Sequence, residues 1–131
     1  MQLKNNLYKI ICKEGVGPVV NYTIELIPSC VIYAAHFPGE PITPGVCIAQ
    51  MGKELVEDLL SEQRSTPCKL MITKVKNVKF LSIISPNETL QLTYQVKKLV
   101  TSEDGTSVET QLIVLSEEKP MAKISLVLRI V

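Results

Sequence analysis

The residues that could carry out chemistry gather in one stretch, from His36 to Glu54. The stretch begins with the only histidine of the chain and passes through three prolines at a spacing of three. Imidazole titrates near neutrality, so this histidine suits a general base. Because proline fixes φ and removes a backbone donor, we expect an ordered turn that holds His36 in place.

The segment after the prolines is predicted to begin a helix. Thr43 is expected to be the N-cap and Pro44 the first helical residue, since proline there gives up an amide that has no partner anyway. The amides of Gly45 and Val46 would lie at the positive end of the helix dipole, and glycine lets a ligand approach closely. A carbonyl oxygen placed there would be polarised.

The pattern H-F-P-x-x-P-x-x-P-G, followed by an apolar helix, resembles the active-site segment of the hotdog-fold 3-hydroxyacyl-(acyl-carrier-protein) dehydratases. A second block, residues 78–88, is similar to the K-F-x-x-P-V-x-P-G-D strand and turn of that family. Asn87 replaces the glycine of that turn, and asparagine tolerates a positive φ better than most residues. Ala35 stands where the family commonly has glycine. The resemblance covers nearly the whole chain.

The resemblance implies an α+β hotdog fold, in which a curved antiparallel sheet wraps a long central helix. It also implies an enzyme of fatty-acid or related acyl-chain synthesis that eliminates water from a 3-hydroxyacyl thioester, with no cofactor and no metal. This reaction needs a base, an acid for the leaving hydroxyl, and donors for the enolate-like oxygen. His36 would be the base, and the amides of Gly45 and Val46 the donors. Phe37 and Pro44 would complete the substrate site.

One residue departs from the pattern. The family has Glu or Asp fourteen residues after the histidine, reaching the other subunit of a dimer, but this chain has Gln50, which has no acidic proton to give. Glu54 follows one turn later, on the same helix face. We predict that Glu54 supplies the carboxylate, directly or through a water, while Gln50 orients the substrate. A solvated Glu54 with no catalytic role is an equally good interpretation.

Three functions therefore remain open. The first is a dehydratase that acts on acyl-carrier-protein or coenzyme A thioesters as a homodimer, a heterodimer with a hotdog paralogue, or a higher oligomer. The second is a catalytically impaired partner subunit or acyl-binding protein, and the third is an acyl thioesterase. Some lysines could meet an acidic carrier protein, although the solvated side of a strand explains them equally: Lys69, Lys74, Lys76 and Lys79.

Composition narrows the remaining classes. The 131 residues predict one domain, 1–131, and a net charge of +1 with no tryptophan argues against nucleic-acid binding. No apolar run approaches the roughly 20 residues of a membrane span, and the start lacks a signal peptide, so we expect a cytoplasmic protein. With one histidine and no C-x-x-C pair, a zinc site is not expected. The four cysteines are expected to be reduced and buried: Cys12, Cys30, Cys47 and Cys68.

The pattern of apolar residues predicts the elements. Strands are expected at 7–14 and 19–26, a helix from Gly45 to about Glu62, and further strands to the end of the chain, with a hairpin at Asp104-Gly105. The helix should turn charged residues toward water: Lys53, Glu57, Asp58 and Glu62. Two later strands should bury alternate residues, namely Leu90, Leu92, Tyr94 and Val96, then Ala122, Ile124, Leu126, Leu128 and Ile130.

Overall fold

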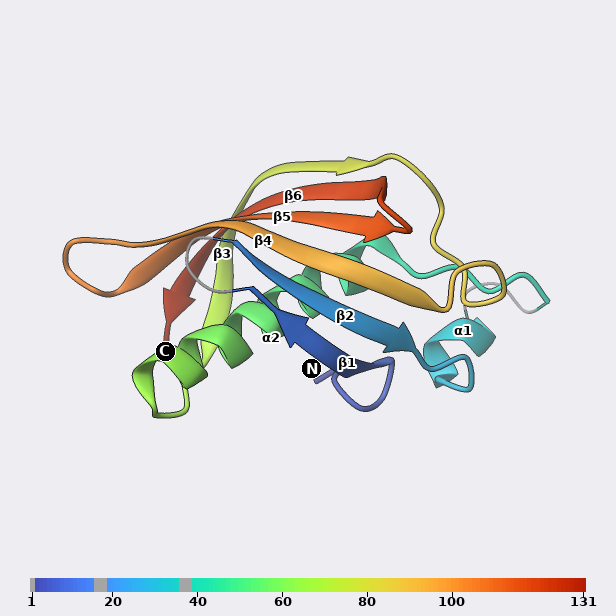
Figure 1. Ribbon diagram of the computed structural model, residues 1–131, viewed down its shortest axis with the longest axis horizontal. Helices are drawn as coiled ribbons and strands as arrows, with labels where there is room; N and C mark the ends of the chain where they lie inside the picture. Colours follow the sequence, from blue (N-terminus) through green and yellow to red (C-terminus); the bar gives the residue numbers. More distant parts are fainter. Residues whose placement is uncertain (1, 16–18, 36–38) are drawn as a thin grey trace.

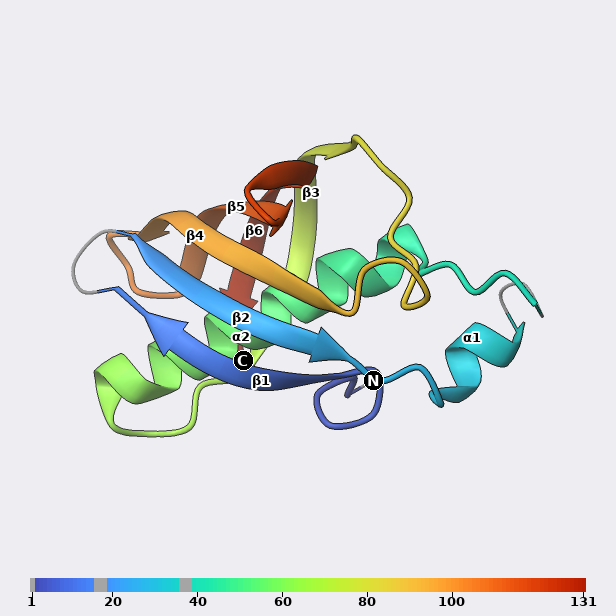
Figure 2. The same cartoon turned by 45° about the vertical axis from the view of Figure 1, so that its right-hand side comes forward.

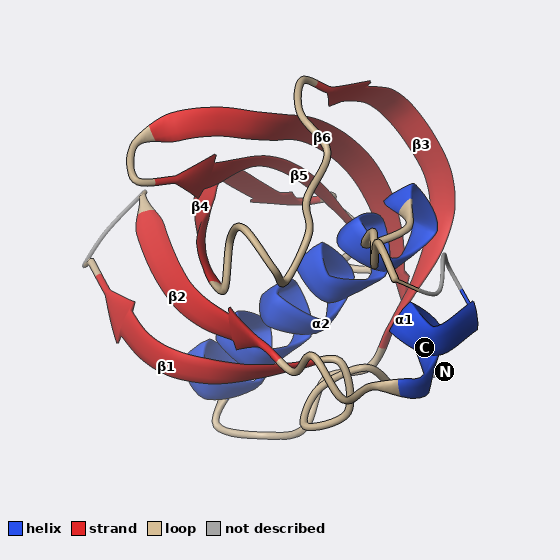
Figure 3. Cartoon of the chain, turned by 90° about the vertical axis from the view of Figure 1, so that its right-hand side faces the viewer, coloured by secondary structure: helices blue, strands red, loops and turns tan. Residues whose placement is uncertain are grey.

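A long helix, α2 (Gly45–Arg64), lies in the hollow of a curved six-stranded antiparallel sheet (Figures 1 and 3). The computed structural model describes residues 2–15, 19–35 and 39–131. The strands pair in the order β1-β2-β4-β5-β6-β3, so β1 and β3 are the edges. The other elements are β1 (Tyr8–Glu14), β2 (Val20–Leu26), α1 (Val31–Ala35), β3 (Leu70–Phe80), β4 (Gln91–Thr101), β5 (Ser107–Ser116) and β6 (Lys119–Ile130). The predicted hotdog architecture is confirmed.

Helix α2 packs most of its surface against the sheet. Its buried residues include Ile48, Met51, Leu55 and Leu59 at helical spacing, together with Gly52. The hydroxyl of Tyr94 on β4 donates to the carbonyl of Ile48 at 2.9 Å, deep in this contact. The helix ends at Ser65, which adopts the left-handed conformation with φ 54° and donates its N–H to the last turn. The predicted helix is confirmed and runs two residues further than expected.

The start of α2 differs from the prediction in its cap. The N-cap is Pro44, in an extended conformation, and Thr43 makes no side-chain capping bond. Instead Thr43 is buried, and its hydroxyl lies 2.8 Å from the hydroxyl of Tyr33. The Pro44 carbonyl accepts the amides of Cys47 and Ile48, which places proline itself at the half-helical position.

The charged side of α2 is also less exposed than predicted. Of the four residues expected to face water, only Glu62 is exposed, and it pairs with Lys13 of β1. Glu57 is only 8% exposed, because its carboxylate accepts the backbone N–H of Leu70 at 2.7 Å. The beginning of β3 thus covers this side of the helix.

The sheet follows the predicted alternation with a few corrections. Leu90 precedes β4 and is exposed, whereas the three apolar residues that follow it at every second position are buried. Ile130 is only partly buried, unlike the four inward residues before it on β6. The Asp104-Gly105 hairpin is confirmed between β4 and β5, with Gly105 at φ 73°.

The cysteines and charged groups show no sign of a metal site in the described residues. All four thiols are free, but only Cys47 and Cys68 are buried, so the prediction of four buried thiols is wrong for Cys12, which is exposed, and for Cys30, which is partly buried. Within residues 2–15, 19–35 and 39–131, no three His, Cys, Asp or Glu side chains gather closely enough to hold a metal ion. Across the same ranges, no helix combines the length and apolar character needed to cross a bilayer.

Candidate active site

A pocket of about 340 Å³ opens at the start of α2. Its walls come from the first turn of the helix, the segment just before it and the loop that follows β3. The side chains around it are mostly apolar: Ile42, Thr43, Gly45, Ile48, Phe80, Leu81, Ser82, Ile83 and Ile84. Such a lining suits the hydrocarbon part of an acyl group.

The loop after β3 is tied to the helix start by backbone bonds. The amide of Thr43 donates to the carbonyl of Ile84 at 2.8 Å, and the side chain of Ile84 is fully buried. At the other end of the pocket wall, the amide of Leu81 donates to the carbonyl of Met121 on β6 at 2.9 Å. Figure 2 shows this loop descending from the sheet to the beginning of α2. Asn87, further along the loop, does not adopt a positive φ, so the freedom of the family's glycine is not used here.

The first turn of α2 presents backbone donors next to the pocket. The amides of Cys47 and Ile48 turn back to the Pro44 carbonyl, while those of Gly45 and Val46 have no backbone acceptor among the described residues. Gly45 lines the pocket, and Val46 is 71% exposed beside it. These two N–H groups lie at the positive end of a 20-residue helix, where they can stabilise a partial negative charge on an oxygen.

Of the predicted site residues that the structure describes, only Gly45 lines the pocket. Gly45 forms part of the pocket wall, whereas Pro44 and Val46 are adjacent in sequence but are not among the lining residues. His36 and Phe37 lie outside the described residues. Their roles as base and substrate contact therefore stay predictions.

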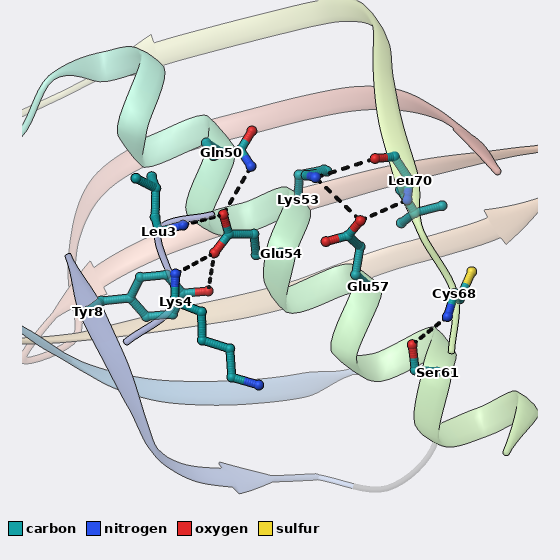
Figure 4. A network of polar contacts seen from close by, with 10 residues as sticks. All are labelled: Leu3, Lys4, Tyr8, Gln50, Lys53, Glu54, Glu57, Ser61, Cys68 and Leu70. Atoms are coloured by element: carbon teal, nitrogen blue, oxygen red, sulfur yellow. Dashed lines mark hydrogen bonds and ion pairs between the residues drawn. The ribbon is translucent and has the colours of Figure 1, made fainter. Parts of the chain in front are cut away.

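Gln50 and Glu54 do contact each other, one turn apart on α2 (Figure 4). The Gln50 Nε2 group donates to Glu54 Oε2 at 3.0 Å. Glu54 is only 4% exposed, which contradicts the interpretation of a solvated residue. The adjacent positions of the two side chains agree with the prediction from helix geometry.

Glu54 receives three further donors from the beginning of the chain. Its Oε2 atom accepts the amide of Leu3 at 2.8 Å, and its Oε1 atom accepts the amide of Lys4 at 2.8 Å and the hydroxyl of Tyr8 at 3.0 Å. A carboxylate offers about four lone-pair sites, and here four donors occupy them. That Glu54 supplies the carboxylate of the reaction, directly or through a water, stays a prediction.

The surroundings of Glu54 also act on Tyr8. Burial of the phenol, followed by the nearby Glu54 charge, raises the pKa of Tyr8 far above its ordinary value. Tyr8 therefore keeps its proton and remains a hydrogen-bond donor to Glu54 at any ordinary pH.

Sequence reasoning missed this role of the N-terminal segment, and it missed the aromatic wall of the pocket. The donors to Glu54 are 46 to 51 residues away in sequence, so no local pattern links them. Phe80 is different, because it stands in the block that resembled the family's strand and turn, and that block could have drawn attention to it.

Comparisons with known proteins identify relatives of this chain. A family model described as ApeI-like, ApeI dehydratase, matches residues 15–112, well over half of the chain. Two curated relatives are both described as 3-hydroxyacyl-[acyl-carrier-protein] dehydratase FabZ. The protein of Clostridium acetobutylicum is 33% identical over 72 residues, which cover 52% of this chain and 49% of the relative. The protein of Lactiplantibacillus plantarum is 28% identical over 104 residues, which cover 75% and 71%. The match thus spans about half the length of the first relative.

Solved structures share the fold at low identity. The dehydratase heterocomplex ApeI:P from Xenorhabdus doucetiae matches with a TM-score of 0.60 and 16% identity, over 92% of this chain and 96% of that one. A hypothetical thioesterase from Streptococcus pneumoniae, solved with coenzyme A, matches with a TM-score of 0.61 and 13% identity, over 94% and 87%. At such identity these structures support the fold alone.

Proposed function

This chain belongs to the ApeI-like dehydratase family, and we propose that it eliminates water from a 3-hydroxyacyl thioester to give the trans-2-enoyl thioester. The observation that carries the proposal is the apolar pocket at the start of α2, which has the amide of Gly45 in its wall. An acyl chain fits the apolar lining, and the thioester carbonyl fits the amide donors.

In the proposed reaction, the amides of Gly45 and Val46 bind the thioester oxygen and stabilise the charge that develops there. His36 accepts the proton from the α-carbon. The bond between the β-carbon and its hydroxyl then breaks, and the proton held by His36 passes to the departing hydroxyl, which leaves as water. We assign both proton transfers to His36. Gln50 has no acidic proton, and the oxygens of Glu54 already accept hydrogen bonds from four donors.

We further propose that the active unit is a dimer, either of two copies or with a hotdog paralogue. The edge strand β3 and the loop after it expose several large apolar side chains: Met71, Val75, Phe80, Leu81 and Ile83. An apolar edge strand left open invites pairing with another chain. One structural neighbour is a dehydratase heterocomplex, which is the kind of assembly that the mixed dimer would be.

The thioester is proposed to be carried by acyl-carrier protein or coenzyme A, in the cytoplasm. Lys69, Lys74 and Lys79 are exposed on or beside β3 and could meet an acidic carrier. Lys76 is already paired with Glu109 at 2.6 Å, which makes it the least available of the four lysines.

A second candidate function has one observation in its favour. The amide at Gln50, where the resembling family has a carboxylate, favours a partner subunit that needs a second, acid-bearing chain for turnover. Such a subunit would bind acyl thioesters in the same pocket without dehydrating them alone.

The test is to incubate the purified chain with a synthetic 3-hydroxyacyl thioester. Ultraviolet absorbance of the conjugated enoyl product reports dehydration, and a thiol reagent reports hydrolysis. Enoyl product without free thiol supports the proposal. Free thiol identifies a thioesterase, and neither product, together with binding of the thioester, identifies the partner subunit.

A further inference from the structure

We propose that the hydroxyl of Thr43 donates its hydrogen into the pocket at the start of α2 and binds the 3-hydroxyl oxygen of the acyl group, with Tyr33 as a positioning residue behind it. Thr43 would thus select 3-hydroxyacyl groups over acyl groups without a 3-hydroxyl. The inference deepens the proposed function and rests on it for the class of ligand. The arrangement of the two side-chain hydroxyls stands on the contacts alone.

The hydroxyl of Thr43 is a buried polar group in a mostly apolar wall. Thr43 lines the pocket, and only 3% of its surface is exposed. Its amide donates to the carbonyl of Ile84, another residue of the lining, at 2.8 Å, so the backbone that carries the hydroxyl is held in place. Ser82 also brings a hydroxyl to the lining, but Ser82 is only partly buried, so water can satisfy it.

The same hydroxyl is held from behind by Tyr33 of α1. The Oη atom of Tyr33 lies 2.8 Å from Oγ1 of Thr43, and Tyr33 is only 4% exposed. Burial raises the pKa of Tyr33, so the phenol keeps its proton at ordinary pH. Tyr33 itself is not among the residues that line the pocket. It therefore acts on a ligand through Thr43.

The pair of hydroxyls has one hydrogen more than the bond between them uses. Within residues 2–15, 19–35 and 39–131, neither hydroxyl has a second hydrogen-bond partner. A phenol is a stronger donor than an aliphatic alcohol, so Tyr33 donates to Thr43, and the spare hydrogen belongs to Thr43, at the pocket. A buried hydroxyl hydrogen without an acceptor is unfavourable. An oxygen atom of a bound ligand would supply that acceptor.

The proposed reaction indicates which oxygen this is. The amides of Gly45 and Val46 serve the thioester oxygen, and the other oxygen of a 3-hydroxyacyl group is its 3-hydroxyl. A hydrogen bond from Thr43 to that oxygen stabilises the negative charge that develops on it as its bond to the β-carbon breaks. Thr43 keeps its own hydrogen, and the proton of the departing water comes from His36 as before.

The selectivity is tested by calorimetric binding of two unreactive probes to the full chain. The probes are 3-hydroxyoctanoyl-pantetheine and octanoyl-pantetheine, each with an amide in place of the thioester. A site that binds a ligand oxygen through a buried donor rejects the analogue that lacks this oxygen, because the donor is then left without a partner. The wild type should bind the hydroxyl-bearing probe about tenfold more tightly.

Three variants locate this preference. Thr43→Val keeps the shape of the side chain without its hydroxyl and should abolish the preference, so that the two probes bind equally. Thr43→Ser restores a hydroxyl and should keep most of the preference. Tyr33→Phe should lie between wild type and Thr43→Val, because Thr43 keeps its hydrogen but loses the group that orients it.

Tyr22→Phe is the matched control for Tyr33→Phe. Tyr22 is also buried, and its hydroxyl also bonds a side chain, donating to Asp58 of α2 at 2.9 Å, but Tyr22 does not line the pocket. Its variant should keep the wild-type preference. An equal loss of preference in Tyr22→Phe and Tyr33→Phe overturns the positioning role of Tyr33.

Equal affinities of the wild type for the two probes overturn the inference, and this comparison needs no variant to fold. A preference that survives in folded Thr43→Val overturns it as well. In both cases the probes still bind, and enoyl formation decides the proposed function separately. If neither probe binds the wild type, the pocket does not take acyl groups, and the inference and the proposed function fail together.

Discussion

The ring of Phe80 lies directly over the α-carbon of Gly45. A Cβ atom built on Gly45 would be 2.7 Å from Cζ of Phe80 and 2.8 Å from Cε2. Real side chains do not tolerate such contacts, so only glycine lets the ring close the pocket at the beginning of α2. Phe80 is 51% exposed, which means that its ring is a wall of the pocket and not a part of the core.

Gly45→Ala should therefore damage the site more than the fold. The added methyl group displaces the Phe80 ring, which is the end of a half-exposed side chain and can swing away at a cost of about 1 kcal/mol or less. The pocket then loses a wall next to the amide donors. We expect KM for a 3-hydroxyacyl thioester to rise several-fold, with the urea midpoint close to that of the wild type.

Gly52→Ala is the corresponding test of the core. A Cβ atom there would lie 2.7 Å from Cδ1 of Leu112, which is buried on β5 under the middle of α2. Overpacking of this kind should lower the free energy of unfolding by about 1–3 kcal/mol, measured by urea denaturation. Equal stability losses in Gly45→Ala and Gly52→Ala would contradict this distinction between a pocket wall and a core contact.

Local sequence patterns predicted the elements of the fold but not the contacts between residues far apart in the chain. The helical spacing of apolar residues predicted α2, and Asp104-Gly105 predicted its hairpin, because both signals are local. Glu57 was predicted to face water, since nothing nearby in sequence announces that the amide of Leu70 will reach it. The contacts of Glu54 with Leu3, Lys4 and Tyr8 could not be predicted for the same reason, because these residues come from the other end of the chain.

Tyr8 should make the protein sensitive to alkali. Burial, then the charge of Glu54, raises the pKa of Tyr8 far above its ordinary value of about 10, so the folded chain keeps a proton that the unfolded chain loses. The free energy of unfolding should then fall as the pH rises above about 10, by up to roughly 1.4 kcal/mol per pH unit for this residue. Buried Tyr22 and Tyr94 have raised pKa values too and add to the slope.

Urea denaturation at several pH values above 9 measures this slope. Tyr8→Phe removes the ionisable group and should have a shallower slope than the wild type, although it also loses the bond to Glu54 and starts from a lower stability. Identical slopes in the two proteins would mean that Tyr8 ionises as readily in the folded chain as in the unfolded one.

Asp104 should act in the opposite pH range. The hydroxyl of Ser102, then the hydroxyl and amide of Thr106, bind its carboxylate and lower its pKa to about 2. The stabilisation from this group is thus present above its unfolded value near 4 and is lost as the pH falls through about 2. A titration of the Asp104 carboxyl resonance should show a midpoint near 2. A midpoint near 4 would show that the hairpin bonds do not hold in solution.

The most direct test of the account is the rate of enoyl formation from a 3-hydroxyacyl thioester by the wild type and by His36→Ala, followed by ultraviolet absorbance. His36 is the only histidine of the chain, so no second imidazole can replace it. We expect steady formation of enoyl thioester by the wild type and a loss of at least a hundredfold in His36→Ala, with the urea midpoint unchanged. Equal rates in the two folded proteins would contradict dehydration by this site.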